Sequence, residues 1–385
     1  MDYVNVGPVD RSTTASAVTT RAEIRSGEEA LKLEFETPSD LVLSRHNIGD
    51  AVVLPALLIA MRRGLPLRMV DSVSPSLLAN LETFGRIFAT WFPRELSYVA
   101  IEAPAGRDRR PSRAARNVVG QCFTGGIDSM YSLLTATKAP DILIYGLGID
   151  TTDPRRLPAT DPTARLEAIA KRHDAQLVML HTNVKQLSIK AGLTWGGMAH
   201  GAALGAIGHL LSGTLSTLVI PATHSYATAQ PWGSGPWTDP LMSSRSLEVV
   251  HHGAELNRAG KTETIAQSVD VRDSLRVCLK MNSDENCGTC KKCIRTMLGL
   301  ELAGGLSQSN RLPRTIDVEA ADAITLTAHQ DIRHIEDVRD RAVELGTRPD
   351  IVAIAQAMVT RGYAAIAAEA EAAATEAEAA AEASA

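Results

Sequence analysis

Aromatic side chains, long apolar runs and targeting signals are all scarce in this chain of 385 residues. Phe, Trp and Tyr together make up 4% of the sequence. No apolar run approaches the roughly 20 residues that a membrane-spanning helix needs. Residues 1–13 (MDYVNVGPVDRST) contain neither the basic stretch nor the apolar stretch of a signal peptide. We therefore expect a cytoplasmic protein with no membrane partner.

Basic residues are not in excess either. The chain has 39 Lys and Arg against 44 Asp and Glu, which gives a formal net charge of -5. Proteins that bind nucleic acid over a broad surface usually carry a positive field, so we expect no nucleic-acid partner. The arginine-rich run 104–116 (PAGRDRRPSRAAR) is best interpreted as a solvated linker.

Cysteine is rare outside one short segment. Of five cysteines, Cys278, Cys287, Cys290 and Cys293 lie within 16 residues, and Cys122 is interpreted as a core thiol. In a reducing compartment, such a cluster predicts a metal site rather than disulfides. Four thiolates suit a structural Zn²⁺ with no open coordination position. An iron–sulfur cluster and redox thiols remain alternatives.

The order of expected strands and helices indicates an α/β protein. From Asn117 onward, apolar strands alternate with helical segments, which predicts a doubly wound parallel sheet with ligands at the carboxyl ends of its strands. We expect residues 1–20, rich in Ser and Thr, to be ill-ordered. The predicted segments are a small α/β domain (1–104), a linker (105–116), a ligand-binding domain (117–270), a zinc knuckle (271–305), a helical extension (306–363) and an Ala/Glu-rich tail (364–385).

The stretch QCFTGGIDSMYSLL (121–134) predicts a strand, a glycine turn and a helix. The first N–H groups of a helix lack intrahelical partners, and the helix dipole is positive there, so such a turn can hold a phosphate. Thr124 and Ser129 add hydroxyl donors, and Asp128 can cap the turn or help hold Mg²⁺. A plain capped turn is the alternative. No G-x-x-x-x-G-K-[ST] motif occurs, because GAELNRAGKT (253–262) has six residues where the motif has four.

The turn TGGIDS resembles the S-G-G-x-D-S loop of the PP-loop ATP pyrophosphatase superfamily, with Thr124 in place of the usual serine. This resemblance implies an adenine nucleotide alpha hydrolase-like fold and cleavage of ATP between its α and β phosphates. It also implies adenine binding at the end of the second strand, by Tyr145, Gly146, Leu147 and Gly148. The implied pyrophosphate-binding residues are Thr124, Gly125, Gly126, Ile127, Asp128 and Ser129.

The cysteine spacing, together with the turn, is similar to that of the 7-cyano-7-deazaguanine synthases, over about residues 117–300. In that family a lysine opens a helix at the position of Lys261, in KTETIA (261–266). The resemblance implies that Lys261 faces the nucleotide or substrate; a surface lysine is the alternative. Residues 1–104 and those beyond about 305 are not part of the typical synthase, so we expect a different substrate.

The long Gly/Pro/Trp loop 223–245 follows an expected strand and is interpreted as facing the substrate. His224 is a candidate for substrate binding or proton transfer, and the alternative is an ordinary loop histidine. Asp239 is a candidate for binding the substrate or an amine. The predicted substrate loop residues are Thr223, His224, Trp237 and Asp239, and the predicted catalytic residues are Asp128, Lys261 and His224.

Together these patterns favour an ATP-dependent ligase that forms AMP and pyrophosphate. A carboxylate or carbonyl oxygen of a small molecule would be adenylated and then coupled to ammonia or an amine, giving an amide, amidine or nitrile. The implied cofactors are ATP, Mg²⁺ and a structural Zn²⁺, and a homodimer is compatible with the sequence. Two alternatives are sulfur transfer through the same adenylation and a non-catalytic nucleotide-binding protein.

Overall fold

The computed structural model of the protein describes residues 2–104, 106–149, 161–279 and 283–383. The chain forms two compact units. The N-terminal unit comprises Met1–Thr124 and Tyr131–Glu255, and the C-terminal unit comprises Gly125–Met130 and Leu256–Ala385. The glycine turn therefore groups with the C-terminal unit, although a strand of the N-terminal unit leads directly into it.

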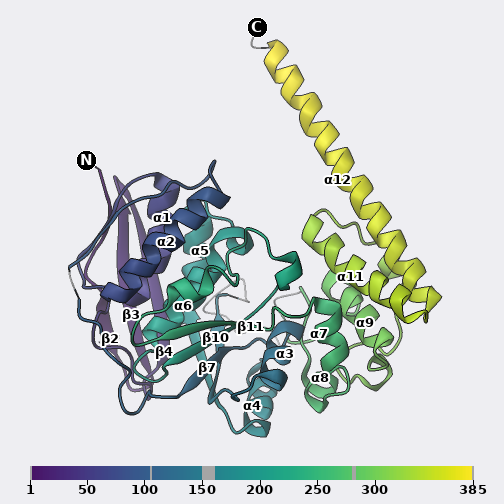
Figure 1. Cartoon of the computed structure of the whole chain (residues 1–385), viewed down its shortest axis with the longest axis horizontal. Helices are drawn as coiled ribbons and strands as arrows, with labels where there is room; N and C mark the ends of the chain where they lie inside the picture. Colours follow the sequence, from purple (N-terminus) through teal and green to yellow (C-terminus); the bar gives the residue numbers. More distant parts are fainter. Residues whose placement is uncertain (1, 105, 150–160, 280–282, 384–385) are drawn as a thin grey trace. The chain divides into compact units, whose positions relative to one another are not determined.

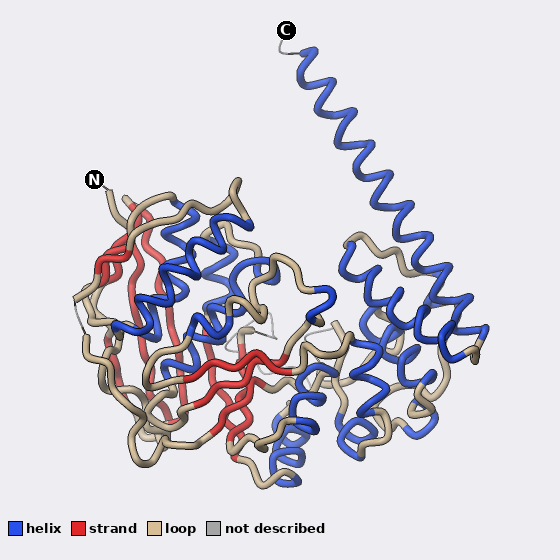
Figure 2. The backbone as a smooth tube through the Cα atoms, viewed as in Figure 1, coloured by secondary structure: helices blue, strands red, loops and turns tan. Residues whose placement is uncertain are grey.

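The N-terminal unit is built on one mixed sheet with helices packed against it (Figures 1 and 2). Within the described residues the strands are β1 (Val4–Val6), β2 (Asp10–Thr13), β3 (Ala17–Ser26), β4 (Glu29–Pro38), β5 (Leu67–Met69), β6 (Ile101–Glu102), β7 (Val119–Cys122), β8 (Ile142–Leu147), β9 (Gln176–Thr182), β10 (Thr217–Pro221) and β11 (Glu248–His252). Their order is β11-β10-β7-β8-β9-β4-β3-β1-β5-β6, with β2 paired to β3. The prediction of an α/β protein with a largely parallel sheet is confirmed.

Strands β7 to β11 form a parallel half of the sheet. Every residue of β7 and β8 is buried, as expected for parallel strands that are covered on both faces. The chain places β8 and then β9 on one side of β7, and β10 and then β11 on the other. The winding therefore reverses between β7 and β10, and α/β proteins bind ligands at the carboxyl ends of strands beside such a reversal.

Residues 1–104 do not form a sheet of their own, which corrects the predicted domain boundary at the linker. Strand β4 pairs antiparallel with β9, with Phe35 opposite Thr182, so the N-terminal strands extend the same sheet. The N-terminal unit accordingly continues from residue 104 across the linker. Local sequence carries no signal for a pairing between segments so far apart in the chain.

The prediction that residues 1–20 are ill-ordered is wrong. Strand β2 pairs with β3, and β1 lies between β3 and β5 with Val4 and Val6 buried. Serine and threonine fit a half-exposed strand once the backbone has a partner. The composition is therefore that of a surface strand and not that of a disordered terminus.

The main helices of the N-terminal unit are α1 (Asp50–Arg63), α2 (Pro75–Trp91), α4 (Thr163–Arg172), α5 (Val184–Lys190) and α6 (His200–Leu210). Helix α3 (Ile127–Thr135) is divided, because its residues up to Met130 group with the C-terminal unit. The Gly/Ala-rich α6 packs against α1. A Cβ added at Gly205 would lie 3.0 Å from Leu54 Cδ1 and 2.8 Å from Met242 Sδ. The small residues of α6 therefore permit the close packing that the sequence predicts.

In the described part of the C-terminal unit the chain forms helices and loops (Figure 2). Its main helices are α7 (Arg258–Ile265), α8 (Val269–Ser274), α9 (Lys291–Leu302), α10 (Val318–Asp322), α11 (His329–Leu345) and α12 (Pro349–Ala383). A separate apolar core joins α7, α9, α11 and α12 and includes Ile294, Leu298, Ile335, Val338 and Met358. The predicted helical extension after residue 305 is confirmed.

Helix α12 continues through most of the Ala/Glu-rich tail. Among the described residues, only its segment Pro349–Ala373 is long and apolar enough to cross a membrane by length and composition alone. One such helix is weak evidence, since the core helix of a soluble protein meets the same criterion, and Ile351, Ala355, Met358 and Val359 belong to the C-terminal core. The cytoplasmic location stays a prediction.

Candidate anion site and metal centre

The glycine turn joins β7 to α3. Gly125 has a φ of +78°, a left-handed conformation that favours glycine. The Ser129 hydroxyl donates a hydrogen bond to the Gly126 carbonyl at 3.1 Å, while Thr124 is half-buried and Ile127 is buried. The first N–H groups of α3 and the positive end of its dipole lie at this turn. The predicted succession of strand, turn and helix is confirmed.

Asp128, in the first turn of α3, faces two cations from α7. Arg258 donates a hydrogen bond to its Oδ2, and Lys261 Nζ lies 3.6 Å from its Oδ1. Lys261 is only 1% exposed, so it is not a surface lysine. The two cations share one face of α7 because they are three residues apart, and the Asn257 side chain caps this helix by accepting the Gly260 N–H at 2.9 Å.

A third cation, Arg295 of α9, is buried next to this group. Its Nη1 lies 3.5 Å from Oδ1 of Asp331 on α11, and Lys291 Nζ donates to Oδ2 of the same carboxylate at 2.6 Å. Burial, and then repulsion from Arg258, lower the pKa of Arg295 to about 9, whereas Asp331 and Asp128 raise it. The guanidinium therefore stays charged at neutral pH, with Arg258 and Asp128 among its electrostatic neighbours.

These six residues form what we term the basic cluster: Asp128, Arg258, Lys261, Lys291, Arg295 and Asp331. Within the described part of the chain, these contacts set four cations against two carboxylates, which is a local excess of positive charge. Among the described residues, the buried Nε atoms of Arg258 and Arg295 have no hydrogen-bond acceptor. Because buried charge is costly unless it is paired, such a surplus beside a glycine turn is suited to an anionic ligand with several acceptor oxygens.

The four clustered cysteines converge on one point. The Sγ atoms of Cys278, Cys287, Cys290 and Cys293 all lie within 4.8 Å of one another. Two of these separations are 3.8 Å, between Cys278 and Cys290, and 3.9 Å, between Cys287 and Cys293. Sulfurs held about 2.3 Å from a tetrahedral Zn²⁺ would lie about 3.8 Å apart. The cluster could therefore hold a zinc ion.

The surroundings of the cysteines also fit a metal. The backbone N–H groups of Thr289 and Cys290 donate to Cys287 Sγ at 3.4 and 3.3 Å, and such bonds favour a thiolate. The adjacent Cys293 thiol lowers the pKa of Cys290 to about 4. Gly288 has a φ of +75°, and a Cβ there would lie 2.6 Å from Pro313 Cγ, so the turn requires glycine.

Residue 276 connects the cysteine cluster to the glycine turn. The Arg276 N–H donates to the Gly125 carbonyl at 2.9 Å, and its guanidinium donates to the carbonyls of Ser283 and Cys278. On the other side of the cluster, α9 carries both Cys293 and Arg295. The metal centre is thus linked to the anion site through short stretches of chain at both of its ends.

The residues predicted to meet adenine lie at the carboxyl end of β8. Tyr145 and Leu147 are 6% and 1% exposed, so their side chains belong to the core. A Cβ at Gly146 would lie 2.8 Å from Ile149 Cδ1, and Gly148 follows the strand with a φ of +89°. These residues lie at the predicted strand end, and their contact with adenine stays a prediction.

The predicted substrate loop separates into two aromatic groups. Thr223 and His224 directly follow β10, and the His224 ring is edge-on to Trp232 with the ring centres 5.5 Å apart. Trp237 is half exposed and packs edge-on against Trp91 of α2, with the ring centres 6.2 Å apart. His224 therefore has an aromatic neighbour past a strand end, whereas Trp237 packs against α2.

Asp239 corrects one prediction. Its carboxylate is fully buried and accepts hydrogen bonds from Ser234 Oγ at 2.7 Å and the Gly235 N–H at 3.1 Å. His251 Nδ1 lies 2.8 Å from the same carboxylate. These partners are all internal to the N-terminal unit, so Asp239 holds the loop in place and does not face a substrate. The sequence alone does not show whether an aspartate in a loop is exposed to solvent or buried by the loop itself.

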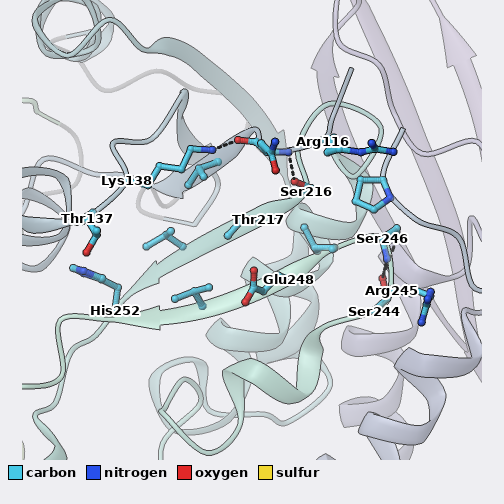
Figure 3. Close-up of a pocket in the computed structure, with 17 residues that line it drawn as sticks. Arg116, Thr137, Lys138, Ser216, Thr217, Ser244, Arg245, Ser246, Glu248 and His252 are labelled. Carbon is cyan, nitrogen blue, oxygen red and sulfur yellow. Dashed lines mark hydrogen bonds between the residues drawn. The ribbon is translucent and has the colours of Figure 1, made fainter. Parts of the chain in front are cut away.

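A cavity of about 580 Å³ lies beside β7, β10 and β11 (Figure 3). Val119, Thr217 and Glu248, near the amino ends of these strands, line it together with Lys138 and Arg245. Its lining includes Ser244 and Arg245, at the end of the predicted substrate loop 223–245, but none of the individual site residues predicted from the sequence. Ligands of α/β proteins usually bind at the carboxyl ends, so this cavity does not serve as the candidate nucleotide site.

Sequence reasoning missed Arg258, Arg295 and Asp331. Arg258 could have been found, since it is three residues before Lys261 on an expected helix and so shares its face. Arg295 and Asp331 are far from the glycine turn in sequence. Only the packing of α9 and α11 brings them together and makes Asp128 an electrostatic neighbour of Arg295.

Comparison with known proteins gives no match: no family model matches the chain, no curated protein does, and no solved structure does. The candidate site therefore rests on the chemistry and geometry of its own residues.

Proposed function

We propose that the protein is an ATP-dependent ligase that forms AMP and pyrophosphate. The observation that carries this proposal is the basic cluster at the glycine turn. There the partly buried Arg258 and the buried Lys261 and Arg295 outnumber the carboxylates that they contact among the described residues. The strand order on either side of β7 supports a doubly wound fold of the PP-loop type. A turn of this kind without a Walker lysine favours binding of a leaving pyrophosphate.

In the proposed reaction, negative charge develops on the pyrophosphate as it leaves ATP. A carboxylate or carbonyl oxygen of the substrate attacks the α-phosphorus of ATP, and the bond from that phosphorus to the bridging oxygen breaks. Pyrophosphate leaves with the bridging oxygen and its electron pair. Ammonia or an amine then displaces AMP, which retains the substrate oxygen. Preorganised cations such as Arg258 and Lys261 stabilise the negative charge that builds on the pyrophosphate.

The two implied metals fit the chain differently. Asp128 accepts a hydrogen bond from Arg258 at Oδ2, whereas its buried Oδ1 has no hydrogen-bond partner among the described residues and would be the oxygen available to a Mg²⁺. No step here depends on that ion. The four cysteines do fit a Zn²⁺. A Cys₄ zinc supplies rigidity without an open position for chemistry, and an iron–sulfur cluster is the alternative occupant.

Sulfur transfer through the same adenylation is the second candidate, and it has less support. It needs a cysteine outside the cluster that can carry a persulfide. Cys122 is the remaining cysteine of the sequence, and it is buried in β7 next to the turn. A Cys122→Ser variant with full turnover would exclude this route.

Product analysis with ATP and a panel of small carboxylic acids and amines tests the proposal. AMP and pyrophosphate are the expected products, and ADP with phosphate would overturn it. Arg258→Gln should lower turnover at least tenfold through loss of a charge-assisted contact, whereas the exposed control Arg172→Gln should not. Tight binding of ATP without turnover for any substrate pair would favour the non-catalytic alternative.

A further inference from the structure

We propose that Arg295 is a direct anion-binding residue of the nucleotide site and that Asp331, in the C-terminal extension, is its positioning residue. The proposal rests on the proposed function, since it assigns Arg295 to the leaving pyrophosphate. It also gives a role to the helical extension, to which the sequence motifs, namely the glycine turn and the cysteine spacing, assign no function.

The described contacts of Arg295 fix the position of its side chain but do not use all the hydrogen-bond donors of its guanidinium. The residue is 6% exposed. Among the described residues its carboxylate contact is Nη1 to Asp331 Oδ1, and this distance of 3.5 Å is beyond the usual length of a charge-assisted hydrogen bond. Its buried Nε has no acceptor among the described residues. The guanidinium is thus oriented but retains donor capacity for a further anion.

Asp331 is also occupied from its other side. Lys291 Nζ donates to Oδ2 at 2.6 Å, a much shorter contact than the one to Arg295. One carboxylate therefore serves two cations, and Asp128 likewise serves both Arg258 and Lys261. The guanidinium of Arg295 presents a planar set of N–H donors, and the described part of the protein does not provide an acceptor for all of them. An oxyanion with several acceptor oxygens could accept hydrogen bonds from the remaining donors.

The extension places these groups by packing. Helix α11 contacts both α7, which carries Arg258 and Lys261, and α9, which carries Arg295. Its buried Ile332, Ile335 and Val338 share one apolar core with Ala259 of α7 and Ile294 of α9. The extension thus holds the two cation-bearing helices in one register and supplies the carboxylate that orients Arg295.

A competing interpretation is that Arg295 balances the negative charge of the metal centre. It is two residues from Cys293, and the Cys290 thiolate raises its pKa slightly. The two interpretations differ in what is lost when the charge is removed: affinity for an anion in one case and retention of the metal in the other.

The test is calorimetric titration of the zinc-loaded full chain with inorganic pyrophosphate. Arg295→Gln should weaken binding by about ten- to a hundredfold, the range for loss of a charge-assisted hydrogen bond. It should also reduce the dependence of affinity on salt concentration, because one charge is gone. Arg295→Lys should keep that salt dependence and give intermediate affinity, since it keeps the charge but loses the fork.

Asp331→Asn should weaken binding severalfold, and Asp331→Glu should restore part of it. The matched control is Arg341→Gln on α11, whose guanidinium pairs with Glu263 at the surface. It should leave pyrophosphate affinity unchanged. Zinc content and thermal unfolding of every variant show whether the C-terminal unit remains folded.

The outcomes separate this inference from the function on which it rests. If wild-type protein binds neither pyrophosphate nor ATP, the proposed function fails. If wild type binds pyrophosphate and both Arg295 variants, folded and zinc-loaded, bind it equally well, only the role of Arg295 fails. Loss of zinc from Arg295→Gln, with affinity intact after zinc is restored, would show that the arginine serves the metal centre instead.

Discussion

The two units bury two networks of charged and polar groups that differ in how far they are satisfied. In the N-terminal unit, the Asp239 carboxylate accepts bonds from Ser234 and Gly235 and lies beside His251. In the C-terminal unit, Asp128 and Asp331 face four cations, and two buried Nε atoms lack acceptors among the described residues. The first network is closed around its carboxylate, although the nearby His200 Nδ1 has no hydrogen-bond partner among the described residues, and the second has a surplus of charge.

This difference separates a structural role from a binding role. A buried network whose members satisfy one another stabilises a particular fold. A buried network with surplus charge lowers stability unless a ligand completes it. Residues of both kinds are buried and charged, so burial and charge alone do not identify a site.

The largest effect should follow from removing the metal that supports the second network. Cys290→Ser should release the metal, and the C-terminal unit should unfold, since structural Zn²⁺ contributes on the order of 10 kcal/mol to small metal domains. Metal analysis and hydrogen exchange over residues 256–345 measure this. Cys122→Ser is the control and should retain one metal per chain. A metal-free C-terminal unit that stays protected from exchange would refute a structural role.

A smaller loss of stability is expected when the Asp239 carboxylate is removed from the closed network of the N-terminal unit. Asp239→Ala leaves Ser234, Gly235 and His251 without their acceptor, which should lower the free energy of unfolding by about 3–5 kcal/mol. Denaturant unfolding measures it, and exchange near His251 should rise. The exposed control Asp40→Ala should change stability by no more than about 0.5 kcal/mol. An equally small change for Asp239→Ala would mean that the network is not closed.

Acid should weaken the N-terminal unit. Burial lowers the pKa of His200, beside Asp239, and of His209, near Asp50, so each binds a proton at lower pH in the folded protein than in the unfolded chain. The unfolded chain binds a proton to each below about pH 6.5, so stability falls as pH drops below that value, by at most about 1.4 kcal/mol per pH unit for each histidine. His209→Gln should flatten the pH profile of unfolding, whereas the exposed control His46→Gln should not. A profile flat from pH 6.5 to 5 in wild type would contradict this.

The smallest change in stability should come from the surplus network. Lys261→Met removes a buried cation, and because Asp128 keeps Arg258, the free energy of unfolding should change by no more than about 1 kcal/mol. Pyrophosphate affinity should nevertheless fall about tenfold or more. Calorimetry and denaturant unfolding of the same samples give both values. A large loss of stability with unchanged affinity would make Lys261 a structural residue like Asp239.

Several features of the fold and the candidate site could be predicted because they are local. Alternation of apolar strands with helices from Asn117 indicates the parallel half of the sheet, and the turn at Gly125 and the spacing of the four cysteines are short-range patterns. Lys261 was assigned toward the nucleotide by resemblance. It is buried and faces Asp128, and its contact with a nucleotide stays a prediction. Asp239 was not assigned correctly, because whether a polar residue faces solvent or its own loop depends on residues elsewhere.

The sequence by itself determined what kinds of local structure and chemistry the chain can form: a phosphate-type turn, a four-thiolate cluster and strands of an α/β sheet. Only the tertiary structure decided that β4 joins β9 in one sheet, that Arg258 pairs with Asp128 and that Arg295 meets Asp331. The physical reason is that backbone conformation and ligand spacing depend on a few adjacent residues, whereas a surplus of buried charge exists only after distant helices have packed around it.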